Sequence, residues 1–240
     1  MTAESTAESI EIADDDLVTL DADLELDEAA EGRDLAVALP WRGFRHTNGY
    51  LFTTMLLSAL LSLTAAVVLS IDAWILAADP TKELACDINA VLSCGSVALS
   101  DQATLFGFPN SFLGLIFEPV VITLAIASLG GTRFPRWFMA TAQFIYLLAL
   151  IFALWLFFQS TYVIHALCPW CLVITFGTTM VFMTLLHVNI RDNNLYLPRG
   201  LQRKAESALR MNLDLLMTFL MIAAITAIIL VNYGTAIFGV

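Results

Sequence analysis

Residues 169–188, PWCLVITFGTTMVFMTLLHV, decide the fold class of this chain. Twenty residues in a helix extend for about 30 Å, which is the thickness of the hydrocarbon core of a bilayer. The run contains no Asp, Glu, Lys or Arg. It is therefore predicted to be a transmembrane helix.

Four more apolar runs of this kind occur in the chain, each bounded by charged or turn residues. They cover residues 49–76, 110–129, 137–162 and 213–231. Hydrophobic residues make up 59% of the 240 residues and charged residues only 14%, a composition unlike that of soluble domains. We expect an all-α integral membrane protein with five transmembrane helices.

The net charge of −11 arises in the N-terminal segment, residues 1–40, which holds thirteen acids and one base. This segment has no apolar run long enough for a signal peptide, and it is predicted to be a disordered cytoplasmic tail. The rest of the chain is nearly neutral, so the acidic charge does not indicate a nucleic-acid partner.

The basic residues predict the orientation, because Lys and Arg are retained on the cytoplasmic side. They precede the first span and join the second to the third and the fourth to the fifth: Arg42, Arg45, Arg133, Arg136, Arg191, Arg199, Arg203, Lys204 and Arg210. The opposite connections, residues 77–109 and 163–168, contain only Lys82. We predict a plasma-membrane protein with a cytoplasmic N-terminus and these two connections outside.

All four cysteines, Cys86, Cys94, Cys168 and Cys171, lie in the outward connections or at the helix start beside them. The outer face of a bacterial plasma membrane is oxidising, so disulfides form and persist there. The pattern predicts thiol chemistry at this face.

Cys168 and Cys171 open the fourth span as Cys168-Pro169-Trp170-Cys171. Residues i and i+3 share a helical face and lie within disulfide reach, and proline suits the first helical turn. The free N–H groups of a helix start favour a thiolate. These features favour a redox pair, with half of a zinc site or a static disulfide as alternatives.

The spacing of the other pair argues against zinc. Four thiolates can bind this metal, but zinc knuckles separate their cysteines by two to four residues, and seven residues separate Cys86 from Cys94. We expect no metal. This connection of about thirty residues is long enough to be functional, and its cysteine pair is expected to exchange with the C-x-x-C pair unless it is purely structural.

These cysteine pairs, with SCGSV at residues 93–97 and FGFPNS at residues 106–111, resemble the vitamin K epoxide reductase family. The resemblance covers residues 49–187 and points to the stand-alone bacterial type. It implies a four-helix bundle core around a quinone, menaquinone or ubiquinone, within residues 41–190. A basic cytoplasmic loop over residues 191–212 and a fifth transmembrane helix within residues 213–240 would follow.

The resemblance also implies a role for each cysteine. Cys171 would react with the quinone, Cys168 would exchange with Cys94, and Cys86 would meet the thiol of an extracytoplasmic thioredoxin-like protein. Some bacterial relatives carry a fused thioredoxin-like domain, whereas this sequence stops at Val240. A separate partner is therefore expected.

Three residues are expected to contact the quinone. Asn110 matches the family asparagine that hydrogen-bonds a quinone carbonyl, although it also suits the N-cap of the second span. Thr175 stands four residues after Cys171, where the human-type enzyme has a tyrosine, and its shorter hydroxyl can still donate a hydrogen bond. Phe176 follows it.

Other polar residues in apolar surroundings are secondary candidates. Glu118 lies eight residues into the second span, where an acid suits proton handling, but a structural role is favoured. His165 precedes Cys168 by three residues and would stabilise a thiolate when protonated, but a plain interfacial position is favoured. Asp72 lies near the end of the first span.

The combined pattern favours an enzyme, a membrane thiol:quinone oxidoreductase. It would reoxidise a thioredoxin-like carrier and so support disulfide formation in exported proteins. A vitamin K quinone or epoxide reductase driven by lumenal thiols is the alternative within the family. A non-catalytic membrane scaffold with two inert disulfides is the alternative from another class.

Overall fold

The computed structural model describes residues 43–89 and 91–238, so the predicted tail of residues 1–40 lies outside the described residues. The chain divides into two units, Met1–His46 and Thr47–Val240, which are described separately. In the first unit, Phe44–His46 form a single 3-10 turn, η1. Every other element belongs to the second unit.

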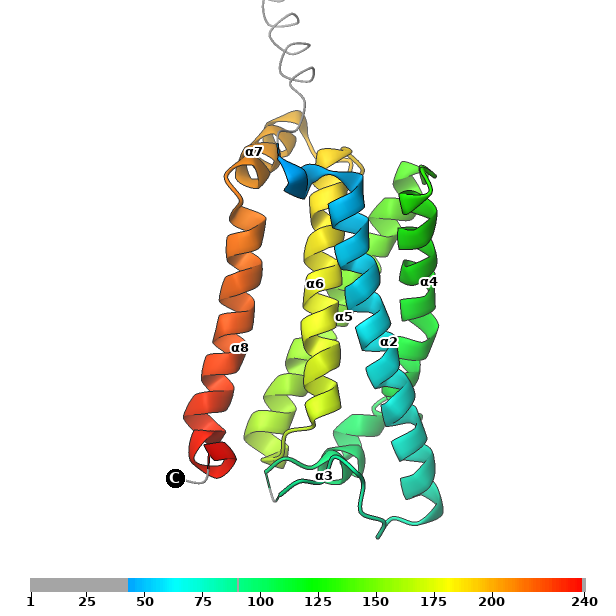
Figure 1. The fold of residues 1–240 in the computed structure, drawn as a ribbon, viewed down its shortest axis with the longest axis vertical. Helices are drawn as coiled ribbons and strands as arrows, with labels where there is room; N and C mark the ends of the chain where they lie inside the picture. Colours follow the sequence, from blue (N-terminus) through cyan, green and yellow to red (C-terminus); the bar gives the residue numbers. More distant parts are fainter. Residues whose placement is uncertain (1–42, 90, 239–240) are drawn as a thin grey trace, which may run out of the picture. The chain divides into compact units, whose positions relative to one another are not determined.

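Five helices of the second unit are long and apolar enough to cross a membrane. They are α2 (Asn48–Ala78), α4 (Ser111–Leu129), α5 (Arg136–Gln159), α6 (Pro169–Arg191) and α8 (Leu213–Phe238). Figure 1 shows α2, α4, α5 and α6 side by side in a bundle, with α8 along α6. The predicted all-α membrane fold and its five spans are confirmed.

Helix α2 lies at the centre of the packing, against both α4 and α6. Small residues allow the close approach to α6: a Cβ on Gly177 would lie 1.9 Å from the Ser62 Oγ. Glycine and serine are common at such contacts, because apolar burial does not drive helix association in lipid and close packing has to supply the attraction. The larger side chains of Met55, Leu124 and Leu185 fill the core between the helices.

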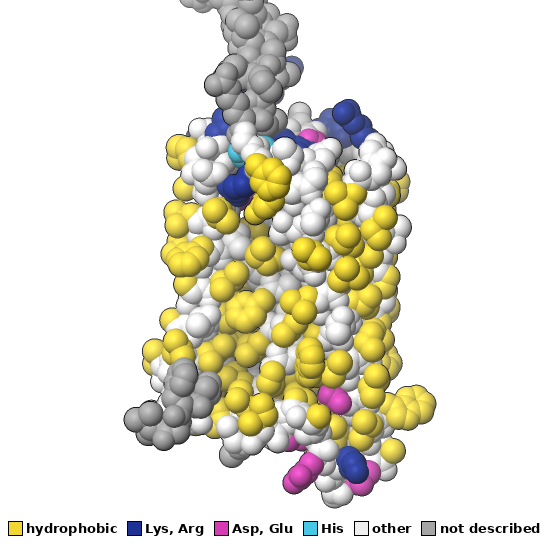
Figure 2. Space-filling view, in the orientation of Figure 1, with side chains coloured by type: hydrophobic (Ala, Val, Ile, Leu, Met, Phe, Trp, Pro, Cys, Tyr) yellow, Lys and Arg dark blue, Asp and Glu magenta, His cyan; other side chains and the backbone are white. Residues whose placement is uncertain are grey.

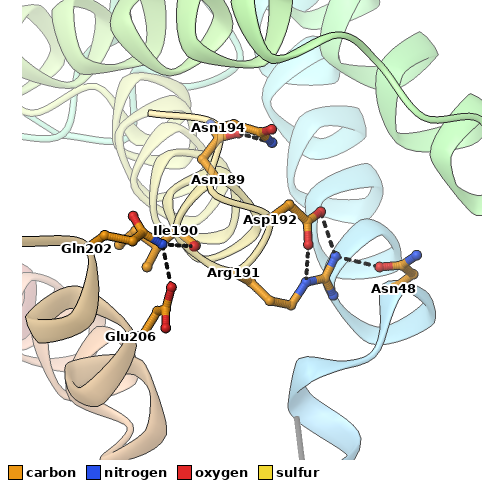
Figure 3. A network of polar contacts seen from close by, with 8 residues as sticks. All are labelled: Asn48, Asn189, Ile190, Arg191, Asp192, Asn194, Gln202 and Glu206. Atoms are coloured by element: carbon orange, nitrogen blue, oxygen red, sulfur yellow. Dashed lines mark hydrogen bonds and ion pairs between the residues drawn. The ribbon is translucent and has the colours of Figure 1, made fainter. Parts of the chain in front are cut away.

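Polar side chains tie the helix ends far from the cysteines (Figure 3). Arg191 at the end of α6 donates from Nη2 to the Asn48 Oδ1 of α2 at 2.6 Å. Gln202 donates from Nε2 to the backbone oxygen of Ile190 at 2.7 Å. These bonds join the start of α2 and the segment after α6 to the end of α6.

Residues 191–212, expected as a basic loop, contain the helix α7 (Arg199–Arg210). Gln202 and Leu209 are its buried residues, and their spacing of seven places them on one face of a helix. The basic side chains occupy the remaining faces. The segment is therefore an amphipathic helix that packs against α6 and α8.

Helix α8 makes a polar contact with the bundle near each of its ends. The Nδ1 of His187 in α6 lies 2.7 Å from the Asp214 Oδ2. At the other end, the Tyr233 hydroxyl donates to the backbone oxygen of Thr161 at 2.6 Å. Thr161 belongs to η3 (Ser160–Ile164), a π-helical continuation of α5.

Figure 2 shows hydrophobic side chains over the middle of the visible face, most of the Lys and Arg at the α7 end, and most of the visible Asp and Glu at the opposite end. The connection between α2 and α4 forms that opposite end with the helix α3 (Cys94–Ala98) and the 3-10 turn η2 (Asp101–Thr104). The distribution agrees with the positive-inside pattern. The direction of insertion stays a prediction.

Candidate functional site

Two backbone hydrogen bonds hold the loop beside the start of α6. Leu167 donates its N–H to the Val91 carbonyl at 2.7 Å, and Ser93 donates its N–H to the Leu167 carbonyl at 3.0 Å. Leu92 and Leu167 thus form an isolated parallel bridge. Because Cys94 follows Ser93 and Cys168 follows Leu167, the bridge places these two cysteines next to each other.

The Asp87 carboxylate holds the loop in shape. It accepts hydrogen bonds from the backbone N–H of Leu84 at 2.8 Å, the backbone N–H of Gly95 at 2.9 Å and the Ser93 hydroxyl at 2.8 Å. Partial burial raises the pKa of Asp87, but these bonds outweigh it and hold the pKa below its ordinary value. A Cβ on Gly95 would lie 3.0 Å from the Asp87 Oδ2, so glycine permits the close approach.

The structure brings the four predicted cysteines together at this end of the bundle. Cys86 and Cys94 form a disulfide with a Cα–Cα distance of 5.6 Å. Cys168 and Cys171 are free thiols, and the Cys168 Sγ lies 3.6 Å from the Cys94 Sγ. The loop pair is therefore oxidised, the C-x-x-C pair is reduced, and the two pairs are in contact.

The surroundings of Cys168 lower the pKa of its thiol. A hydrogen bond from the Cys171 thiol is the main cause that lowers the pKa of Cys168, burial opposes it, and the backbone N–H groups of Cys171 and Trp170 lower it further. Cys168 is the N-cap residue of α6, and its Sγ accepts a hydrogen bond from the backbone N–H of Cys171 at 3.2 Å. His165 is exposed and is not the source of this shift.

A cavity of about 830 Å³ lies inside the bundle below the cysteines. It begins at Cys94, Cys168 and Cys171, the connection before α4 covers it, and α2, α4, α5 and α6 form its walls. The lining is mostly apolar, with a few polar side chains that include Asn110, Glu118, Tyr146, Thr175 and Thr178. This size and lining are typical of sites for small organic molecules.

Asn110 occupies the N-cap position of α4, but its side chain makes no capping bond. Its Nδ2 donates to the Gln102 carbonyl at 2.7 Å. Its Oδ1 is buried and has no hydrogen-bond partner among the described residues. An orphaned oxygen at a cavity wall suits a ligand with a hydroxyl group.

Thr175 and Phe176 point to different places. Thr175 lines the cavity, and its hydroxyl donates to the Cys171 carbonyl at 2.9 Å, so that donor is already used inside the helix. Phe176 packs against the apolar cluster that contains Phe157 and Ile225. Phe176 is not among the residues that line the cavity, and its contact with a quinone stays a prediction.

Two acids in the spans have partners that sequence reasoning did not identify. Glu118 is 4% exposed, and its Oε2 accepts a hydrogen bond from the Tyr146 hydroxyl of α5 at 3.0 Å. The Asp72 Oδ2 of α2 lies 3.8 Å from the Cys86 Sγ. An acid within an apolar span was the available signal, but the partners lie on other segments.

Asp72 also belongs to the one group of possible metal ligands among the described residues. Its carboxylate and the sulfur atoms of Cys86 and Cys94 lie within 4.8 Å of one another. Zinc binds cysteines as thiolates, and these two sulfur atoms are joined in a disulfide. The group therefore does not form a metal site in this oxidation state.

Comparison with protein-family models matches residues 53–186 to the vitamin K epoxide reductase family. The matched region includes α2 to α6 almost completely and all four cysteines. No curated protein matches the chain.

Proposed function

Because the chain belongs to the vitamin K epoxide reductase family and is a multi-pass membrane thiol–disulfide oxidoreductase, we propose that it passes electrons from a thioredoxin-like carrier to a quinone. The contact of 3.6 Å between the Cys168 and Cys94 sulfur atoms carries this proposal. It joins the loop disulfide to a dithiol that opens on an apolar cavity.

The outer half of the relay is thiol–disulfide exchange. A thiolate of the carrier attacks Cys86, which is 8% exposed, whereas Cys94 is completely buried. Cys94 leaves as a thiolate and attacks Cys168 of an oxidised C-x-x-C pair, so Cys171 is released. The second carrier thiol then releases Cys86, which attacks Cys94 and frees Cys168. Each step exchanges one S–S bond for another. Overall, two electrons and two protons pass from the carrier dithiol to Cys168 and Cys171.

The result of this sequence is the state described above, with the loop pair oxidised and the C-x-x-C pair reduced. Oxidation of Cys168 and Cys171 to a disulfide then releases two electrons and two protons. A quinone held in the cavity would supply the acceptor for these two electrons and two protons and would become a quinol. A carrier poised near −120 mV can be reoxidised in this direction, because a membrane quinone is the final acceptor.

The residues around the cavity fit such a ring. The apolar walls of the cavity exclude water, and the cavity volume of about 830 Å³ suits a quinone ring and part of its lipid tail. In this proposal Asn110 orients the ring: its second N–H donates to a ring carbonyl, and its unpaired Oδ1 accepts from a ring hydroxyl. The Thr175 hydroxyl, already bound to Cys171, contributes an acceptor rather than a donor.

The proposal places the cysteine end outside the cell, where exported proteins acquire disulfides. The cluster of basic residues at the α7 end supports that orientation. Ile88, two residues from Cys86, is a large exposed apolar side chain beside the disulfide, and it offers a contact for the carrier. The lipid bilayer supplies the quinone from the side.

The function is tested first in bacteria that lack their own membrane disulfide oxidase. Expression of this chain is expected to restore disulfides in an exported reporter, and Cys171→Ala is expected to abolish the effect. Thr123→Ala, a change on the exposed side of α4, serves as the control that keeps activity. Restoration by Cys171→Ala as complete as by the unchanged protein would refute the relay.

The purified protein separates the candidate activities. With a reduced thioredoxin-like carrier and menaquinone or ubiquinone, carrier oxidation is expected to match quinone loss one to one. Turnover of vitamin K epoxide with a dithiol at the same rate would instead favour the reductase alternative. Two disulfides that never exchange under mild reductant would favour the inert scaffold.

A further inference from the structure

Asp72 is an acid in a membrane-spanning helix with a sulfur atom beside it. It lies six residues before the end of α2, between the apolar residues Ile71 and Ala73, and is half-buried. Acids in such positions are costly and are usually retained for function. The 3.8 Å distance from its Oδ2 to the Cys86 Sγ is within hydrogen-bond reach of a thiol.

Cys86 needs a proton donor and acceptor during exchange. When the Cys168 thiolate attacks Cys94, Cys86 is the leaving group and first carries a negative charge. When Cys86 later attacks Cys94, it must lose its proton. Cys86 is 8% exposed, so bulk water reaches it poorly, and a charge left there is unfavourable.

Asp87, the acid nearest to Cys86 in the sequence, already accepts hydrogen bonds from the loop. Its two carboxylate oxygens accept three hydrogen bonds from Leu84, Ser93 and Gly95. A carboxylate that accepts this many bonds is stabilised in its ionised form. The Asp72 carboxyl faces the sulfur atom instead.

We propose that Asp72 is the proton donor and acceptor of Cys86, an inference that rests on the proposed function. As the Cys94–Cys168 bond forms, the Cys86–Cys94 bond breaks and its electron pair goes to the Cys86 sulfur. Protonated Asp72 gives this sulfur its proton and becomes a carboxylate. In the relay direction, where Cys86 attacks Cys94 and frees Cys168, the carboxylate takes the proton from the Cys86 thiol.

The charges around Asp72 favour this cycle. Asp87 and the Cys168 thiolate are the titratable groups that interact with it electrostatically, and both are anionic when exchange begins. A second carboxylate charge would repel the thiolate that forms on Cys86. Release of Cys86 by Cys168 therefore requires a neutral Asp72 together with an ionised Cys168, which predicts a bell-shaped pH profile for this step.

The experiment isolates one exchange step in the detergent-solubilised full-length chain, without quinone or carrier. Cys171→Ala prevents the C-x-x-C pair from closing, so Cys168 can react only with the loop disulfide. Release of Cys86 is followed by alkylation with N-ethylmaleimide and mass spectrometry between pH 5 and about 9, a range set by the carboxyl and thiol groups. A result here is independent of whether the protein reduces a quinone.

In the Cys171→Ala background, Cys86 alkylation is expected to be bell-shaped in pH. Adding Asp72→Asn should leave only the limb that rises with Cys168 ionisation and should slow the reaction at least about tenfold below neutral pH. Asp72→Glu should keep the bell shape, and Asp79→Asn, in the exposed cap after α2, should change nothing.

An unchanged or faster rate in Asp72→Asn would overturn the proposal, because it would mean that the carboxylate is inert or only repels the thiolates. A bell-shaped profile in that variant would do the same. Correct folding is checked by the Cys86–Cys94 disulfide at the start of each reaction. If Asp72→Asn lacks it, the loss of the falling, alkaline limb must be shown with Asp72→Ser instead.

Discussion

Replacing Asp87 by alanine should release the loop that carries Cys86 and Cys94. The change removes three hydrogen-bond acceptor contacts of 2.8 to 2.9 Å. Asp87 is only half-buried, so each bond is taken at about 1 kcal/mol rather than the larger value of a buried charged pair. The docked loop should lose about 3 kcal/mol, which corresponds to roughly a 100-fold shift toward the undocked form.

Access to the disulfide measures this shift. The buried Cys94 is shielded while the loop is docked, so a water-soluble phosphine should reduce Cys86–Cys94 up to about 100-fold faster in Asp87→Ala than in the unchanged protein. Asp101→Ala is the matched control, since Asp101 is an exposed acid in the same connection. The free thiols are counted by alkylation at fixed times.

The same carboxylate predicts a dependence on pH. The pKa of Asp87 is lowered in the folded loop, so its stabilising effect is complete above the ordinary aspartate pKa of about 3.9 and is lost as the pH falls through the lowered value. In strong acid, the disulfide of the unchanged protein should therefore be reduced faster, and its rate should approach that of Asp87→Ala. Equal reduction rates in Asp87→Ala and Asp101→Ala at neutral pH would refute the role assigned to the carboxylate.

Three further changes follow from single contacts. Cys171→Ala removes the thiol that donates to Cys168, so the pKa of Cys168 should rise and its alkylation curve should move to higher pH, as measured by mass spectrometry. Gly177→Ala should cost about 1–3 kcal/mol in thermal unfolding, and adding Ser62→Ala should restore part of it, because the clash is with the Ser62 Oγ. Tyr146→Phe leaves the buried glutamate of α4 without its donor and should cost about 1–3 kcal/mol, whereas no loss of thermal stability would contradict the bond.

The fold was largely predictable because the bilayer imposes a length and a composition on each span. Four of the five apolar runs match their helices to within three residues, and the last helix extends beyond its run to Phe238. The helix α7 was missed, since its twelve residues are polar on most faces and only Gln202 and Leu209 are buried. Its helical form depends on packing against α6 and α8.

The site was predictable in its cysteines and less so in the residues around them. Four cysteines near one end of the spans are visible in a sequence, because each lies beside a span boundary. Thr175 lines the cavity, whereas Phe176 packs into the neighbouring apolar cluster, and its contact with a quinone stays a prediction. Asn110 lines the cavity, its contact with a quinone stays a prediction, and its bond to Gln102 was not foreseeable.

The sequence by itself determined that this is a membrane protein with its thiols at one end, since hydropathy and cysteine position are properties of short segments. Only the tertiary structure decided which sulfur atoms meet. The bridge between Leu92 and Leu167 joins segments 75 residues apart and sets the 3.6 Å contact of Cys94 with Cys168. The approach of Asp72 to Cys86 likewise depends on how the loop folds back over α2. Such contacts follow from the packing of distant segments, and no local pattern encodes them.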